Sequence, residues 1–144
     1  MNSDPPLPRK VQENDVAWEY IKGEEGRTDV IRWKTFLGGN NVDAENTDSH
    51  TRSITMGVCE VPPGAKLDAH YHAEHEVYYV QNGSGKVLLG KKTITVEPGS
   101  CIFVPGDLTH GIKNQGEYTL TLLWIFPTDT WSEVKYHMQA ELKF

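Results

Sequence analysis

Short runs of apolar or alternating residues, each followed by a turn rich in glycine or proline, recur through most of this chain. The runs cover residues 30–37, 53–61, 76–81, 86–89, 93–96, 101–104 and 118–126. The turns between them include Asn82-Gly83, Pro98-Gly99 and Pro105-Gly106. Many short strands with such turns favour an antiparallel all-β sandwich or barrel. Residues 41–51 are polar and acidic and predict a surface loop, and only residues 130–142 are compatible with a helix.

The length and composition suit a single domain. With 144 residues, the chain is long enough to bury a core of its own. We expect the proline-rich residues 1–14 to form a short flexible lead-in and residues 15–144 to form the β-barrel domain. The 14 basic and 20 acidic side chains give a net charge of −6, which argues against a nucleic-acid partner. No apolar run predicts a membrane span and no secretory signal is recognisable, so we expect a cytoplasmic protein.

Two cysteines and two basic residues lie within the predicted strands. We expect Cys59 and Cys101 to be buried free thiols rather than a disulfide, because no secretory signal accompanies them. Arg32 and Lys34 share one face of their strand and could bind an anionic substrate. We interpret them instead as surface charges of the sheet.

Histidines and a carboxylate are concentrated in one short segment. Because side chains alternate along a strand, His70 and His72 point to the same side. A turn after His72 brings Glu76 back beside the two imidazoles, and a later proline–glycine turn delivers His110. Three imidazoles and one carboxylate suit a divalent iron, manganese, nickel, cobalt or zinc ion and leave positions open for water or substrate. We therefore predict a catalytic site that holds one divalent transition metal ion.

The same residues fall at the spacing of the two cupin motifs. The first motif is matched by Gly64, His70, His72, Glu76 and Gly83. The second is matched by Gly99, Pro105, His110 and Asn114. Asp107 stands where the second motif usually has glycine, with Gly106 one place earlier, which leaves the geometry of this turn open. The chain thus resembles a cupin, and the resemblance implies a single-domain jelly-roll barrel with the metal inside and a homodimeric assembly.

A closer resemblance connects the chain with the small cupin lyases that cleave dimethylsulfoniopropionate to dimethyl sulfide and acrylate. It rests on residues 124–136, on residues 32–34 and on the histidine pair followed by Glu76-Val77-Tyr78. In that family, a tyrosine at the position of Tyr78 removes the α-proton of a metal-bound carboxylate. The resemblance therefore implies a small carboxylate substrate, Tyr78 as the general base and Tyr136 as a second catalytic tyrosine.

A cationic sulfonium group would favour aromatic walls. The candidates for such walls are Trp33, Trp124 and Phe103, although each also suits a position in the core. Tyr71 and Tyr79 alternate away from the ligands and are expected to point outward.

Other functions fit the same ligands. An iron-dependent dioxygenase or related oxidoreductase would use them to activate oxygen. A non-catalytic protein would only bind or sense a small molecule, and a sugar-type isomerase or epimerase would need a further acid–base residue. Glu74 and His75 are candidates for that residue, but we expect both to face solvent. His50 and His137 have no predicted role.

Overall fold

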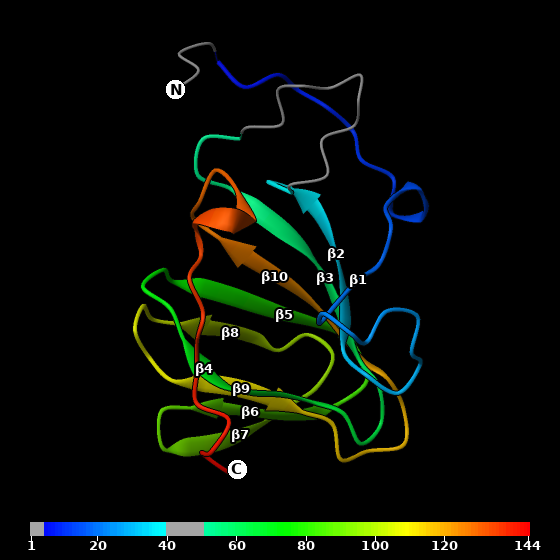
Figure 1. Ribbon diagram of the computed structural model, residues 1–144, viewed down its shortest axis with the longest axis vertical. Coiled ribbons are helices and arrows are strands. Elements are labelled where there is room, and N and C mark those ends of the chain that lie inside the picture. Colours follow the sequence, from blue (N-terminus) through cyan, green and yellow to red (C-terminus); the bar gives the residue numbers. More distant parts are fainter. Residues whose placement is uncertain (1–4, 40–50) are drawn as a thin grey trace.

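The computed structural model describes residues 5–39 and 51–144, which form two antiparallel sheets that face each other (Figure 1). The order of the six-stranded sheet is β1 (Glu19–Tyr20), β2 (Arg32–Leu37), β3 (Thr55–Val61), β10 (Leu120–Phe126), β5 (Glu76–Asn82) and β8 (Cys101–Val104). The order of the five-stranded sheet is β11 (His137–Met138), β4 (Lys66–Tyr71), β9 (His110–Lys113), β6 (Gly85–Leu89) and β7 (Lys92–Val96). Two short 3-10 turns are η1 (Glu13–Asp15) and η2 (Trp131–Glu133). Among the described residues, no helix has the length and apolarity needed to cross a membrane.

The all-β prediction is confirmed, with one correction. Each of the seven predicted runs contains a strand whose ends lie within about two residues of the expected bounds, which is the usual uncertainty of such ends. The expected barrel is not closed, because no hydrogen-bonded ladder joins the two sheets within the described ranges. The loop predicted at 41–51 lies outside the described residues except for Thr51, and so does His50.

The helix considered for residues 130–142 is wrong. η2 supplies a single turn, in which the Thr130 N–H donates to the Glu133 carboxylate at 2.9 Å. The chain then extends, β11 pairs with β4, and the Gln139 N–H donates to the Ala69 carbonyl at 2.7 Å. These partners satisfy backbone groups that a helix would satisfy internally, and local periodicity does not reveal them.

Alternation along each strand separates a buried inner face from an outer face. In β10, Leu120, Leu122, Trp124 and Phe126 are buried, and the residues between them are only half-buried. Burying a large apolar side chain contributes roughly 1.5–3 kcal/mol, so the inner faces hold the two sheets together. The space between these faces also contains the cavity that positions the candidate site.

The outer face of edge strand β8 corrects two expectations. Ile102 and Val104 are buried, whereas Cys101 and Phe103 alternate outward. Cys101 is therefore an exposed thiol, while Cys59 on β3 is a buried one, as expected. Phe103 is 56% exposed and stands beside the His75 ring, so it is not a wall of the cavity.

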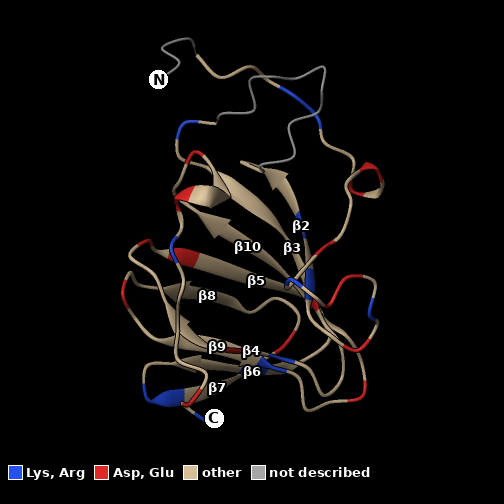
Figure 2. Cartoon of the chain, viewed as in Figure 1, with Lys and Arg blue, Asp and Glu red and all other residues tan. Residues whose placement is uncertain are grey.

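Arg32 and Lys34 lie on the outer face of β2, as predicted, but the segment that precedes β1 covers them. The Trp18 ring lies 3.9 Å from the Arg32 guanidinium carbon and 4.7 Å from the Lys34 nitrogen. Lys34 is buried and donates to the Glu13 carbonyl at 2.9 Å, and Arg32 pairs with Glu60 at 3.3 Å. Both cations are therefore engaged on the side of the sheet opposite the cavity. Elsewhere, acidic and basic residues are interspersed, mostly in loops and near strand ends (Figure 2).

Candidate metal centre

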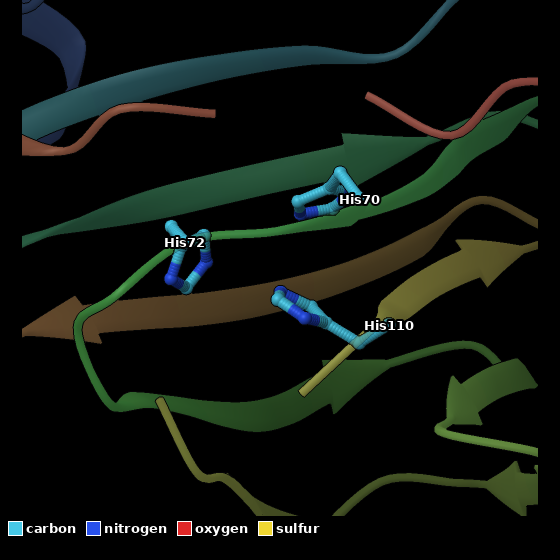
Figure 3. A group of neighbouring side chains, drawn as sticks. All are labelled: His70, His72 and His110. Carbon is cyan, nitrogen blue, oxygen red and sulfur yellow. The ribbon is translucent and has the colours of Figure 1, made fainter. Parts of the chain in front are cut away.

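Three buried histidines converge between the sheets. His70 lies near the end of β4, and His72 is the first residue after that strand. His110 begins β9 and pairs there with His70. One ring nitrogen of each histidine lies within 4.8 Å of a ring nitrogen of each of the other two. Figure 3 shows the three rings facing one another. His70 and His72 thus point to the same side, as predicted, and the pairing of β9 with β4 brings His110 beside them.

Each ring is oriented by a hydrogen bond from its Nδ1 atom. His70 donates to the Asp68 carbonyl at 2.7 Å, His72 to the Glu74 carbonyl at 3.0 Å and His110 to the Leu108 carbonyl at 2.8 Å. A carbonyl oxygen only accepts, so Nδ1 must carry the proton in all three rings. In the neutral imidazoles, the Nε2 atoms then present lone pairs to the shared space, which is the arrangement that metal-binding histidines adopt.

Glu76, the first residue of β5, lies against two of these lone pairs. Its Oε1 atom is 3.3 Å from His72 Nε2 and 3.1 Å from His110 Nε2. Burial favours the neutral carboxyl, but a proton on His110 or His72 Nε2 would donate a hydrogen bond to Glu76, and this effect outweighs burial and lowers the pKa of Glu76 below its usual value. The predicted fourth ligand therefore lies beside the group, and its role as a ligand stays a prediction.

The donor set fits a divalent ion. His70 Nε2 is buried and has no hydrogen-bond partner among the described residues. Burial, followed by the influence of His110, lowers the pKa of His70 to about 4, so this ring is neutral at physiological pH. Lone pairs of neutral imidazoles that face a carboxylate repel it unless a proton or a cation lies between them. Three nitrogens and a nearby oxygen could hold such a cation, and they suit several transition metals.

A cavity of about 310 Å³ adjoins the histidines. Its aromatic walls are Trp33, Tyr78, Trp124, Trp131 and Tyr136. Its aliphatic walls are Ile21, Ile31, Leu67, Ile112, Leu122 and Met138. His70, Glu76 and Cys59 complete the lining. The volume lies near the lower end of the range of small-molecule sites, roughly 300–1,000 Å³.

Both predicted catalytic tyrosines line this cavity. Tyr78 follows Glu76 by two residues on β5, and burial, together with the neighbouring carboxylate, raises its pKa well above the usual value. The Tyr136 ring centroid lies 5.3 Å from that of His70 and 5.4 Å from that of His72, and burial raises its pKa too. Its hydroxyl accepts a hydrogen bond from Trp131 Nε1 at 3.3 Å. The structure thus places both phenols near the histidines, and their catalytic roles stay predictions.

The remaining tyrosines and histidines near the site point elsewhere. Tyr79 is 43% exposed, and Tyr71 stacks on His137 with ring centroids 4.7 Å apart. His75 is exposed, as expected, and its Nδ1 accepts the Gly106 N–H at 2.8 Å.

Sequence reasoning missed two contributors to the site. Trp131 reaches the cavity from η2, where a helix was considered, and no sequence motif marks it. Glu74 was expected in solvent, but its Oε2 atom is buried, has no hydrogen-bond partner within residues 5–39 and 51–144, and lies 4.0 Å from His72 Nδ1. A carboxylate beside the outer nitrogen of a histidine increases the basicity of that ligand. The acidic residue two places after the histidine pair was the available signal.

The turn that delivers His110 resolves the question raised by Asp107. Asp107 adopts a left-handed conformation with φ of 67°, and its N–H donates to the His72 carbonyl at 2.7 Å. The aspartate therefore occupies the conformation that glycine favours. Gly106 is required for another reason, because an added Cβ would lie 2.1 Å from the Ala73 carbonyl oxygen.

Asn114, the last motif residue, has a structural role. Its amide donates to the carbonyls of Val61 and Tyr118 at 2.8 and 2.7 Å, and its side-chain oxygen accepts the Gly116 N–H at 2.9 Å. This buried amide fixes the connection between β9 and β10 beside the end of β3.

Comparison with known proteins agrees with this geometry. The Cupin domain family profile matches residues 57–126. A cupin-2 domain from Rhodospirillum rubrum aligns with a TM-score of 0.69 over 97% of this chain and 86% of that chain, at 16% identity. The polyketide cyclase RemF from Streptomyces resistomycificus aligns with a TM-score of 0.66 over 84% of this chain and 80% of that chain, at 24% identity.

Among curated sequences, an uncharacterized protein from Methanocaldococcus jannaschii is 37% identical over 65 residues, which are 44% of this chain and 51% of that protein. The chain therefore spans about half the length of this relative. The profile match includes all three histidines and both motifs from Gly64 to Asn114, and the two-sheet architecture is shared with solved cupin structures. Residues 57–126 form a cupin domain.

Proposed function

We propose that this cupin is a metal-dependent enzyme that acts on a small carboxylate. The observation that carries the proposal is the group of three buried histidines, of which His70 lines a largely apolar cavity together with Glu76. His70, His72 and His110, with Glu76, would hold the ion. A bound divalent ion supplies positive charge that attracts a carboxylate, stabilises a developing enolate and favours the ionised form of a nearby phenol.

The reaction we propose is a β-elimination. The phenolate oxygen of Tyr78 accepts the α-proton, the C–H electron pair forms the new carbon–carbon double bond, and the β-substituent departs with the electrons of its own bond. A sulfonium leaving group departs as a neutral sulfide and needs no acid. Tyr136, held by Trp131, positions the substrate against His70 and His72. The apolar walls keep water from competing for the proton.

The test uses protein loaded with each candidate metal, quantified by elemental analysis, and incubated with dimethylsulfoniopropionate. We expect dimethyl sulfide in the headspace and equimolar acrylate, with no release by His110→Ala. Tyr78→Phe should lower kcat by about 100-fold or more, as loss of a general base does. Tyr79→Phe removes the neighbouring, outward-facing phenol and should leave kcat unchanged. Full activity of Tyr78→Phe contradicts the assigned base, and absence of product with every metal excludes this substrate.

An iron-dependent dioxygenase is the second candidate, because the same three nitrogens and one oxygen also suit ferrous iron. It predicts oxygen consumption with iron and no turnover with zinc. Equal turnover with and without oxygen contradicts it. Cytoplasmic location and homodimerisation remain parts of the proposal, and size-exclusion chromatography with light scattering tests the dimer.

A further inference from the structure

Few polar side chains line the cavity. Apart from the indoles and the Cys59 thiol, they are His70, Glu76, Tyr78 and Tyr136. The Tyr136 hydroxyl already accepts a hydrogen bond from Trp131. Among the described residues that line the cavity, none is Lys, Arg, Asp, Asn, Gln, Ser or Thr. Trp33 Nε1 is buried without a hydrogen-bond partner among the described residues, and an indole nitrogen can only donate. Away from His70 and Glu76, the walls therefore offer one free donor and few acceptors.

The basic residues closest in sequence to the lining cannot supply a positive charge to a ligand in the cavity. Arg32 and Lys34 flank Trp33, but strand alternation places them on the outer face, where Trp18 covers both. Arg32 also pairs with Glu60, and Lys34 donates to the Glu13 carbonyl. No cation on β2 thus reaches a ligand in the cavity.

These walls select against polar substituents. A hydroxyl placed against them loses its hydrogen bonds with water and leaves its O–H without an acceptor, and a second carboxylate loses far more. Aromatic and aliphatic walls instead favour methylene, methyl and ring groups, and the indole faces also tolerate a diffuse positive charge.

We infer that the substrate is a monocarboxylic acid whose remaining body carries neither a hydrogen-bond donor nor a second negative charge. The inference rests on the proposed function, which supplies the metal-bound carboxylate, and adds the chemical character of the rest of the substrate. Sugars, hydroxy acids and dicarboxylates are excluded as preferred ligands, and with them the sugar-type isomerase considered from the sequence.

The test compares three acids of equal chain length: hexanoate, 6-hydroxyhexanoate and adipate. Isothermal calorimetry on the full zinc-loaded chain measures each Kd. We expect 6-hydroxyhexanoate to bind about 10- to 100-fold more weakly than hexanoate, because burying an unpaired hydroxyl carries a penalty of this size. Adipate should bind more weakly still. Affinities within twofold of one another overturn the inference.

A second readout separates this inference from the proposed function. In cobalt-loaded protein, a carboxylate that reaches the metal changes the visible absorption spectrum, whichever body it carries. A spectrum that changes with hexanoate, together with the expected order of affinities, supports both statements. A changed spectrum with equal affinities overturns the inference alone, and an unchanged spectrum at saturating hexanoate overturns the carboxylate-on-metal proposal and the inference with it. His110→Ala is the control for metal loading, and Tyr79→Phe is the control for an unrelated substitution.

Discussion

Replacing Glu74 with glutamine removes a carboxylate beside the outer nitrogen of a predicted metal ligand. Glu74 Oε2 lies 4.0 Å from His72 Nδ1. Two unit charges at that separation interact by about 4 kcal/mol at an effective dielectric constant of about 20. An imidazole bound to a cation carries only part of a unit charge at this nitrogen, and Glu74 is 21% exposed, so solvent reduces the effect further. We therefore expect the substitution to weaken the free energy of metal binding by about 1–2 kcal/mol, which is roughly tenfold in affinity. This lies near the lower limit for residues that contact a metal ligand from outside.

The assay is a competition for zinc between the protein and a chromophoric chelator of known affinity. Glu97→Gln is the matched control, because it changes the net charge equally at an exposed position. We expect Glu74→Gln to raise the zinc Kd about tenfold and Glu97→Gln to leave it unchanged within twofold. Equal zinc dissociation constants for Glu74→Gln and the unsubstituted protein would refute the electrostatic role of this carboxylate. Equal losses in both variants would show that net charge, rather than contact with His72, is responsible.

Three further outcomes follow from the geometry. Zinc at about 1,000 times its Kd should raise the unfolding free energy by about 4 kcal/mol; thermal denaturation measures this, and a chelator that fails to reverse it contradicts a bound ion. Gly106→Ala should lower the free energy of unfolding by about 2 kcal/mol or more, because the added methyl group clashes with Ala73. Gly116→Ala should lower it less, because the nearest atom to its added Cβ is 3.4 Å away, and urea unfolding compares the two variants. In the native protein, the exposed thiol of Cys101 should react promptly with an aromatic disulfide reagent. Cys59 should not, because burial, with the charges of Glu76 and Glu60, raises its pKa. A second thiol that reacts as fast would contradict the burial of Cys59.

The strands and the convergence of the histidines could be predicted because both depend on local information. Turn residues mark where strands end, and a period of two decides which side chains share a face. Those rules suffice to place His70 beside His72 and Tyr78 behind Glu76. They also place Cys101 and Phe103 on one face of β8. They do not tell which face packs against the second sheet, because both faces of this strand carry apolar residues.

Features that depend on distant partners could not be predicted from the sequence. The segment after β10 has no strand-like pattern, and it becomes extended because β4 offers a free edge. Lys34 is buried by residues that precede it by about twenty positions, and nothing in β2 indicates that cover. The apolar lining of the cavity combines side chains from both sheets, so its selectivity also emerges only from the packed structure.

The hydrogen bonds that orient the three imidazoles have a consequence for how the protein acquires its metal. Each bond joins a ring to a carbonyl two residues away in the same segment, at Asp68, Glu74 or Leu108. The ring orientations are thus set by short-range chain geometry and do not wait for an ion. Association with a metal then needs no conformational step, so its rate should be first order in metal concentration without a plateau. Such a centre exchanges ions as fast as the resident one dissociates, and its occupant therefore reflects the free metals to which the folded protein is exposed.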